Sequence, residues 1–175
     1  MAHALGAGLA PLDINVISGG QQGVMLSLCQ GIRQYRPAGY HGAYIVGILP
    51  NSHFEDANPY LDLALPVGAA HLQNALVPLS ADIVVAIGGA AGTLTEVALA
   101  WQYKKPIALL GKEGWSGKLA SMRLDDRRED SLAHFTTVEG TLEWIAHTMA
   151  TLAWTPRSSD QALWKTGPAV IRSAW

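Results

Sequence analysis

The strongest constraint on the fold is the alternation of short apolar runs with longer segments whose apolar residues recur at helical spacing. Apolar runs at 14–18, 43–49, 82–87 and 106–111 predict strands, and weaker ones are expected at 60–66 and 135–138. The expected helices cover 2–10, 23–35, 68–80, 93–104 and 139–154. Strands that alternate with helices predict a three-layer α/β, Rossmann-like domain with a mostly parallel sheet.

The first strand of such a domain is missing, because this chain opens with the helix-like segment 2–10. The apolar residues 168–172 near the other terminus form a further candidate strand. We expect this strand to fill the empty first slot, either in its own sheet (a circular permutation) or in that of a partner (a swap). The alternative is that it only extends one edge. The chain is expected to be a single domain over 1–175, with 154–167 as a linker.

Composition excludes several classes of protein. With 175 residues, 49% hydrophobic and 15% charged, the chain is typical of one compact domain. A net charge of −2 gives no reason to expect nucleic acid or an anionic membrane as a partner. No apolar run is long enough for a membrane span, and no signal peptide is evident. Together with the single Cys29, interpreted as a small buried hydrophobe, this favours a cytoplasmic location.

Two glycine doublets, each at the end of a predicted strand, are the main candidates for a ligand-binding site. VISGGQQGVM (16–25) and AIGGAAGTLTE (86–96) both pass through Gly-Gly-x-x-Gly into a helix. Glycine accepts positive φ and lets a ligand approach the backbone, and the helix that follows directs free N–H groups at that ligand. Neither loop is a dinucleotide fingerprint or a P-loop. The pattern predicts a phosphate-binding site at the carboxyl edge of the sheet, formed by Ser18, Gly19, Gly20, Gly23, Gly88, Gly89, Gly92 and Thr93.

For several other candidate binding residues, an ordinary structural role is the alternative to ligand binding. The hydroxyls of Ser18 and Thr93 either bind the phosphate or cap a helix, and Thr95 either joins them or faces solvent. Asn74 is expected to contact the ligand or to be a surface amide, and Gly47 to line the pocket through its backbone or to form a turn. The loop that carries His53, Glu55 and Asp56 is expected to be solvated, with no metal site.

Glu96 is either a catalytic group or part of a helix cap. Thr93-Leu94-Thr95-Glu96 matches a capping box, in which Thr93 is the N-cap and Glu96 bonds back to its N–H. We therefore predict that Glu96 is a cap within reach of the ligand, with a catalytic role as the alternative.

SGGQQGVM, GILPNSHFEDANPYLD and ADIVVAIGGAAGTLTEVALAWQYKKPIALL, in that order, resemble the superfamily once mislabelled lysine decarboxylases. Its best-known branch is the LONELY GUY phosphoribohydrolases, but the short branch of molybdenum cofactor carrier proteins is more similar. The resemblance covers about residues 4–120 and implies a Rossmann-like fold, dimers or larger oligomers, and phosphate-bearing ligands in the glycine loops.

The chain departs from the hydrolase pattern PGGxGTxxE at two places. Ile87 stands where that pattern has proline, and Gln73 stands where the hydrolases carry an arginine that acts with the motif glutamate. Glutamine supplies no positive charge for electrostatic stabilisation.

We therefore expect a carrier of a phosphate-bearing small molecule, with the molybdenum cofactor as the ligand that the resemblance implies. The alternatives are a nucleoside 5′-monophosphate phosphoribohydrolase that uses Glu96, and a nucleotide-sensing regulatory protein that contacts a partner through its Trp-rich C-terminal third. A homo-oligomer, dimer or tetramer, is expected in each case.

Overall fold

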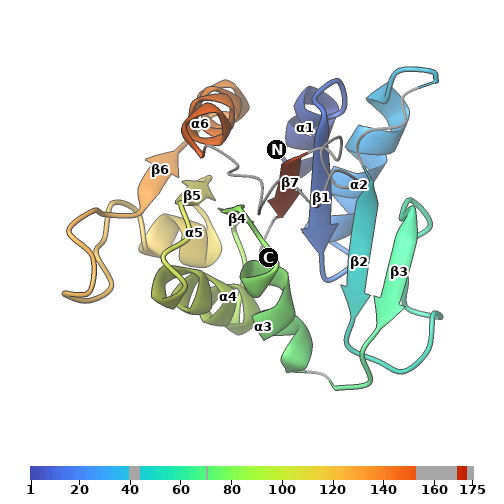
Figure 1. Cartoon of the computed structure of the whole chain (residues 1–175), viewed down its shortest axis with the longest axis horizontal. Helices are drawn as coiled ribbons and strands as arrows, with labels where there is room; N and C mark the ends of the chain where they lie inside the picture. The colour runs from blue at the N-terminus through green and yellow to red at the C-terminus, as the bar shows by residue number, and fades with distance from the viewer. Residues whose placement is uncertain (40–43, 70, 153–168, 173–175) are drawn as a thin grey trace, which may run out of the picture.

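The computed structural model describes residues 1–39, 44–69, 71–152 and 169–172, and these contain one parallel sheet. The strand order is β3-β2-β1-β7-β4-β5-β6 (Figure 1). The strands are β1 (Ile14–Ser18), β2 (Ile45–Leu49), β3 (Leu63–Pro66), β4 (Ile83–Ile87), β5 (Ile107–Leu110), β6 (Ala133–Phe135) and β7 (Ala169–Arg172). The predicted three-layer α/β fold is confirmed.

Helices cover both faces of the sheet. One face carries α1 (Ala2–Leu9), α2 (Val24–Tyr35) and α6 (Val138–Thr151). The other carries α3 (Leu72–Leu79), α4 (Ala91–Gln102) and α5 (Gly114–Lys118) (Figure 1). The centre of the sheet is therefore buried between two apolar cores, and β4 is fully buried along its whole length, as its continuous apolar sequence predicts.

The C-terminal strand lies at the centre of the sheet. β7 pairs in parallel with β1, where Ile14 is in register with Ala169, and with β4, where Ile83 is in register with Ile171. The strand therefore fills the slot of the missing first strand within its own chain, and the alternative of an edge extension is wrong. The predicted linker 154–167 lies outside the described residues, and the single-domain assignment stays a prediction.

The opening helix is tied to α2 by a close crossing of two backbones. A Cβ atom on Gly6 would overlap the carbonyl oxygen of Leu28, and one on Gly31 would overlap that of His3. Small residues on both helices thus allow a contact that larger side chains would block. The small-residue sequence AHALGAGLA therefore forms a helix that packs on the sheet.

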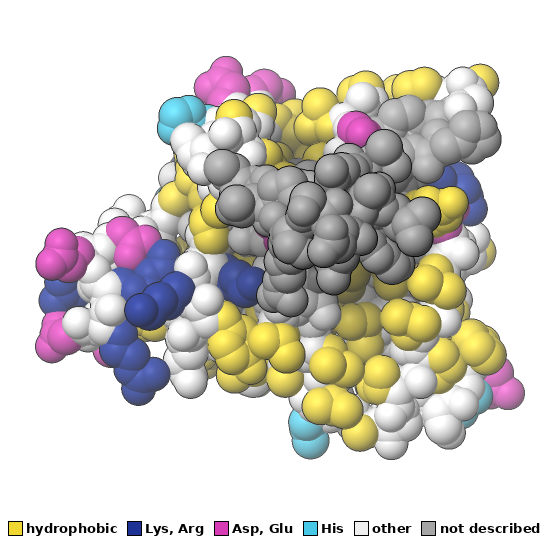
Figure 2. All heavy atoms as spheres, viewed as in Figure 1, with side chains coloured by type: hydrophobic (Ala, Val, Ile, Leu, Met, Phe, Trp, Pro, Cys, Tyr) yellow, Lys and Arg dark blue, Asp and Glu magenta, His cyan; other side chains and the backbone are white. Residues whose placement is uncertain are grey.

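Charged side chains gather around the loop between α5 and β6, at the left of the molecule in Figure 2. Asp126 in this loop is almost fully exposed. Two of its neighbours are structural, however. The Asp125 carboxylate accepts a hydrogen bond from Trp101 Nε1 (2.8 Å), and the Arg128 guanidinium lies 4.4 Å from the centroid of the same ring.

In the described part of the chain, no helix is both long enough and apolar enough to cross a membrane.

One ion-pair network joins the C-terminal end of α2 to the sheet. Asp62 accepts from Arg33 (2.8 Å) and Arg36 (2.7 Å), and its Oδ2 also accepts from the N–H of Ile45 (2.8 Å). Partial burial by itself would raise the pKa of the Asp62 carboxyl. The hydrogen bonds from Arg36 and Ile45 and the two positive charges outweigh that cost, so the pKa is lowered.

Asp62→Asn should lower the free energy of unfolding at pH 7 by about 2 kcal/mol, because a charge-assisted network is lost. Since the folded-state pKa lies below the unfolded value of about 3.9, the stabilisation is complete above that value and disappears as pH falls through the folded pKa. Urea titrations at pH 7 and pH 3 should thus show a gap between wild type and variant that shrinks in acid. Asp126→Asn, which breaks an exposed pair with Arg123, is the control; an equal effect of the two variants would contradict the prediction.

Candidate functional site

Both glycine loops lie at the carboxyl edge of the sheet. β1 ends at Ser18 and β4 ends at Ile87, and all paired strands run in parallel, so the loops that follow leave the same edge. The helices that follow begin at Val24 and Ala91, and in neither case does an N-cap side chain bond the first turn. Two helix N-termini therefore present uncapped N–H groups at one edge of the sheet.

The first glycine loop is shaped by close packing. Ser18 is fully buried, and its hydroxyl accepts a hydrogen bond from the N–H of Gly20 (3.2 Å). Gly20 has φ of +67°, and a Cβ on it would lie 2.7 Å from the Cα of Gly47. Packing thus explains why Gly20 and Gly47 are glycines. Gly23 differs, because it has φ of +72° and a Cβ there would meet nothing within 4 Å. This end of the loop is open.

Asn58, which sequence reasoning missed, anchors the first loop from outside. Its N–H donates to the carbonyl of Gly20 (2.8 Å), and its side-chain amide donates to the carbonyl of Gln21 (3.3 Å) and lies 3.7 Å from the Cys29 sulfur. Burial raises the pKa of the Cys29 thiol to about 11, although the hydrogen bond from Asn58 opposes the shift. Cys29 is therefore an inert, buried thiol at neutral pH, as predicted. The Asn-Pro dipeptide in a polar loop was the only available signal for Asn58.

The second glycine loop is fixed by α5, which was not predicted. The N–H groups of Ser116 and Trp115 donate to the carbonyls of Gly88 (2.9 Å) and Gly89 (3.1 Å), and the Ser116 hydroxyl also donates to Gly88 (3.1 Å). In a trans peptide the N–H points away from the carbonyl. The N–H groups of Gly89 and Ala90 therefore point away from α5. Gly88, with φ of +61°, has open space where a Cβ would lie.

The capping-box prediction is wrong. α4 begins at Ala91 with Ala90 as its N-cap, so Thr93 is the third helical residue rather than the cap. The physical reason is the Gly88-Gly89 turn, whose left-handed residues let Ala90 take the extended conformation of an N-cap. Thr93 is 2% exposed, and its hydroxyl lies against Gly89.

The other two polar residues of this segment have different environments. Thr95 is exposed, and its hydroxyl donates to the carbonyl of Ala91 (3.0 Å). Glu96 is 3% exposed and lies in the second turn of α4. Of the two, only Glu96 is therefore enclosed by the protein.

Two consecutive residues of α3 reach the two glycine loops. The side-chain amide of Gln73 lies against Gly19, where a Cβ would overlap its Nε2 atom. The amide of Asn74 lies 3.9 Å from the place where a Cβ on Gly92 would be. The structure thus places Asn74 near the second loop and Gln73 against the first, where sequence reasoning noted only a missing charge.

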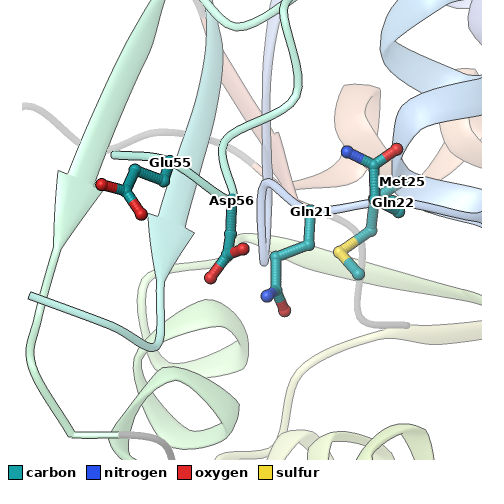
Figure 3. A pocket seen from close by; sticks show the side chains of 5 residues that line it. All are labelled: Gln21, Gln22, Met25, Glu55 and Asp56. Atoms are coloured by element: carbon teal, nitrogen blue, oxygen red, sulfur yellow. The ribbon is translucent and has the colours of Figure 1, made fainter. Parts of the chain in front are cut away.

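A pocket of about 380 Å³ adjoins the first loop and is lined by Gln21, Gln22, Met25, Glu55 and Asp56. In Figure 3, Gln21 and Asp56 extend into the same space, whereas Glu55 points away from it. Asp56 accepts a hydrogen bond from the amide of Asn51. The described residues contain no group of three or more potential metal ligands, and His53 Nδ1 lies 3.9 Å from Glu55 Oε2.

Among the described residues, neither glycine loop nor the pocket contains a lysine or arginine side chain. An anion at this edge would therefore be held by backbone N–H groups and by the positive ends of α2 and α4.

Three solved structures are similar to this chain. The protein TM1055 is 34% identical, with a TM-score of 0.74 over 83% of this chain and 85% of that one. The molybdenum cofactor binding protein from Rippkaea orientalis is 28% identical, with a TM-score of 0.72 over 85% of both chains. The molybdenum cofactor carrier protein from Chlamydomonas reinhardtii is 27% identical, with a TM-score of 0.71 over 86% of both chains.

An uncharacterised protein from Archaeoglobus fulgidus is 28% identical over 110 residues, which are 63% of this chain and 68% of that protein. Together with the solved structures, the family comparison confirms the resemblance to the LONELY GUY-like superfamily and its molybdenum cofactor carriers. The model of the SLOG cluster4 family matches residues 1–142, and this chain therefore belongs to that family.

Proposed function

We propose that this protein is a carrier that binds the molybdenum cofactor, a phosphate-bearing pterin, between its two glycine loops. The observation that carries the proposal is the pair of uncapped helix N-termini at one edge of the sheet, with open space at Gly23 and Gly88. Two similar structures are of proteins named for binding or carrying this cofactor. The proposed contacts are Ser18, Gly19, Gly20, Gly23, Gly47, Asn74, Gly88, Gly89, Gly92, Thr93 and Thr95.

A phosphoribohydrolase is the second candidate, and the burial of Glu96 beside the second loop favours it. A buried carboxyl group at a ligand site is a possible general acid or base. Against this, the position that carries an arginine in the hydrolases is the neutral Gln73. We therefore rank carriage above hydrolysis. The homo-oligomer and the cytoplasmic location stay proposals, and light scattering on the purified protein tests the first.

The purified protein should slow the oxidative decay of free molybdenum cofactor in proportion to its concentration, because a bound ligand is shielded from oxygen and water. The cofactor that survives is measured by its ability to reconstitute a cofactor-free molybdoenzyme. In parallel, incubation with AMP should release no adenine, as judged by chromatography.

Glu96→Gln is the control that separates the two functions. Adenine released by wild type and not by this variant would make the protein a hydrolase. Absence of both protection and binding would overturn the carrier function.

A further inference from the structure

Gln73 is a largely buried residue whose side-chain amide has no hydrogen-bond partner among the described residues. The residue is only 7% exposed, and no described residue hydrogen-bonds its side chain. The amide of a largely buried residue is usually hydrogen-bonded to another protein group, to water or to a ligand. The described residues do not supply such a partner to the Gln73 amide, and the amide is therefore available to a ligand.

The amide is directed at the first glycine loop. Its Nε2 atom occupies the space above Gly19, and the Met25 sulfur lies 3.0 Å from where a Cβ on Gly19 would be. Met25 also lines the pocket of about 380 Å³ beside this loop. Gln73, Gly19 and Met25 therefore form one continuous wall, which runs from the pocket to the uncapped N-terminus of α2.

The next residue extends this wall to the second loop. Asn74 lies near Gly92, and neighbouring side chains on a helix diverge by about 100°. α3 therefore directs one carboxamide to each loop. A ligand that spans the two loops passes both amides.

The pocket beside the first glycine loop favours an uncharged part of the ligand. The described lining of the pocket contains no cation, and the carboxylate of Asp56 extends into it, which is unfavourable for a phosphate at this place. A carboxamide offers both a donor and an acceptor without charge, and it pairs with a group that offers the same. A ring edge with an N–H beside a C=O, as in guanine or a pterin, has this pattern.

We propose that Gln73 is a ligand-binding residue that hydrogen-bonds such an amide-like ring edge at the first glycine loop. This assignment rests on the proposed function, because it concerns the ring of the same ligand whose phosphate the proposed function assigns to the glycine loops. It makes Gln73 a specificity residue, because a ligand whose ring lacks this edge leaves the amide unpaired.

The test compares two probes, the molybdenum cofactor and inorganic phosphate, by equilibrium dialysis without oxygen. Gln73→Met keeps the length of the side chain and removes both hydrogen-bonding groups. It should weaken cofactor binding about tenfold and leave phosphate binding unchanged. Gln73→Glu keeps an acceptor but loses the donor and adds a charge, so it should weaken cofactor binding at least as much. Gln102→Met, an exposed glutamine at the far end of α4, is the matched control and should change neither value.

Each other outcome has a definite meaning. Equal cofactor binding by wild type and Gln73→Met, with unfolding free energies measured to show that both are folded, overturns the assignment of Gln73 alone. An equal loss for both probes means that Gln73 contacts phosphate, which overturns the ring-edge contact. Wild-type protein that binds phosphate but not the cofactor overturns the choice of ligand and the ring edge with it. Wild-type protein that binds neither probe overturns the proposed function itself.

Discussion

A chain truncated after residue 167 should lose its cooperative unfolding transition, because it lacks the strand that joins the two halves of the sheet. β1 and β4 do not pair with each other; each pairs with β7. Without β7 both would present open hydrogen-bonding edges, and such edges promote aggregation. The loss should exceed about 5 kcal/mol, which is most of the stability of an ordinary domain.

Urea titration followed by circular dichroism, with light scattering for aggregation, measures this effect. A chain that lacks only residues 173–175 is the control and should unfold cooperatively, because it keeps β7 intact. If the chain truncated after residue 167 stays soluble and unfolds cooperatively, the central position of β7 is not what holds the sheet together.

Gly92→Ala should abolish most ligand binding without destabilising the fold. The nearest atom to a Cβ on Gly92 is the Asn74 amide at 3.9 Å, so the methyl group fits the free protein. It would, however, occupy the gap between the second loop and Asn74 through which the proposed ligand passes. We expect cofactor binding to fall at least about tenfold. The free energy of unfolding should be unchanged or rise by up to about 1 kcal/mol, since alanine is the better helix former.

Gly140→Ala is the matched control, since Gly140 also lies in the first turn of a helix but on α6. It should bind the cofactor as wild type does. Full cofactor binding by Gly92→Ala, measured by the same dialysis, would place the ligand somewhere other than between the second loop and α3.

Much of the fold follows from periodicity, because buried parallel strands and amphipathic helices leave clear patterns. The structure places β4 and α2 within a residue of the expected segments. The spacing of apolar residues does not predict an element whose position depends on something other than that spacing. α5 has only five residues, two of them glycine, so no apolar stripe marks it. α4 begins earlier than expected because a left-handed glycine pair, rather than a capping side chain, sets its start.

The sequence predicted which loops form the candidate site, but it did not predict which side chains from other segments reach those loops. Glycine doublets after strands indicate a ligand edge from sequence alone. The roles of Gln73 and Asn58 depend on which segments pack together: one reaches the first loop from α3, and the other bonds it from the loop before β3. The sequence pattern of an amide-bearing helix or loop is the same whether the amide faces solvent or a binding site.

The position of β7 also determines when this protein can fold. A ribosome makes β1 and β4 long before β7, although β7 lies between them in the finished sheet. During synthesis, the two three-stranded halves exist without the strand that connects them. The pairings of β1 and β4 with β7 at the centre of the sheet therefore form only after β7 has been made, and until then each of the two strands keeps an open edge.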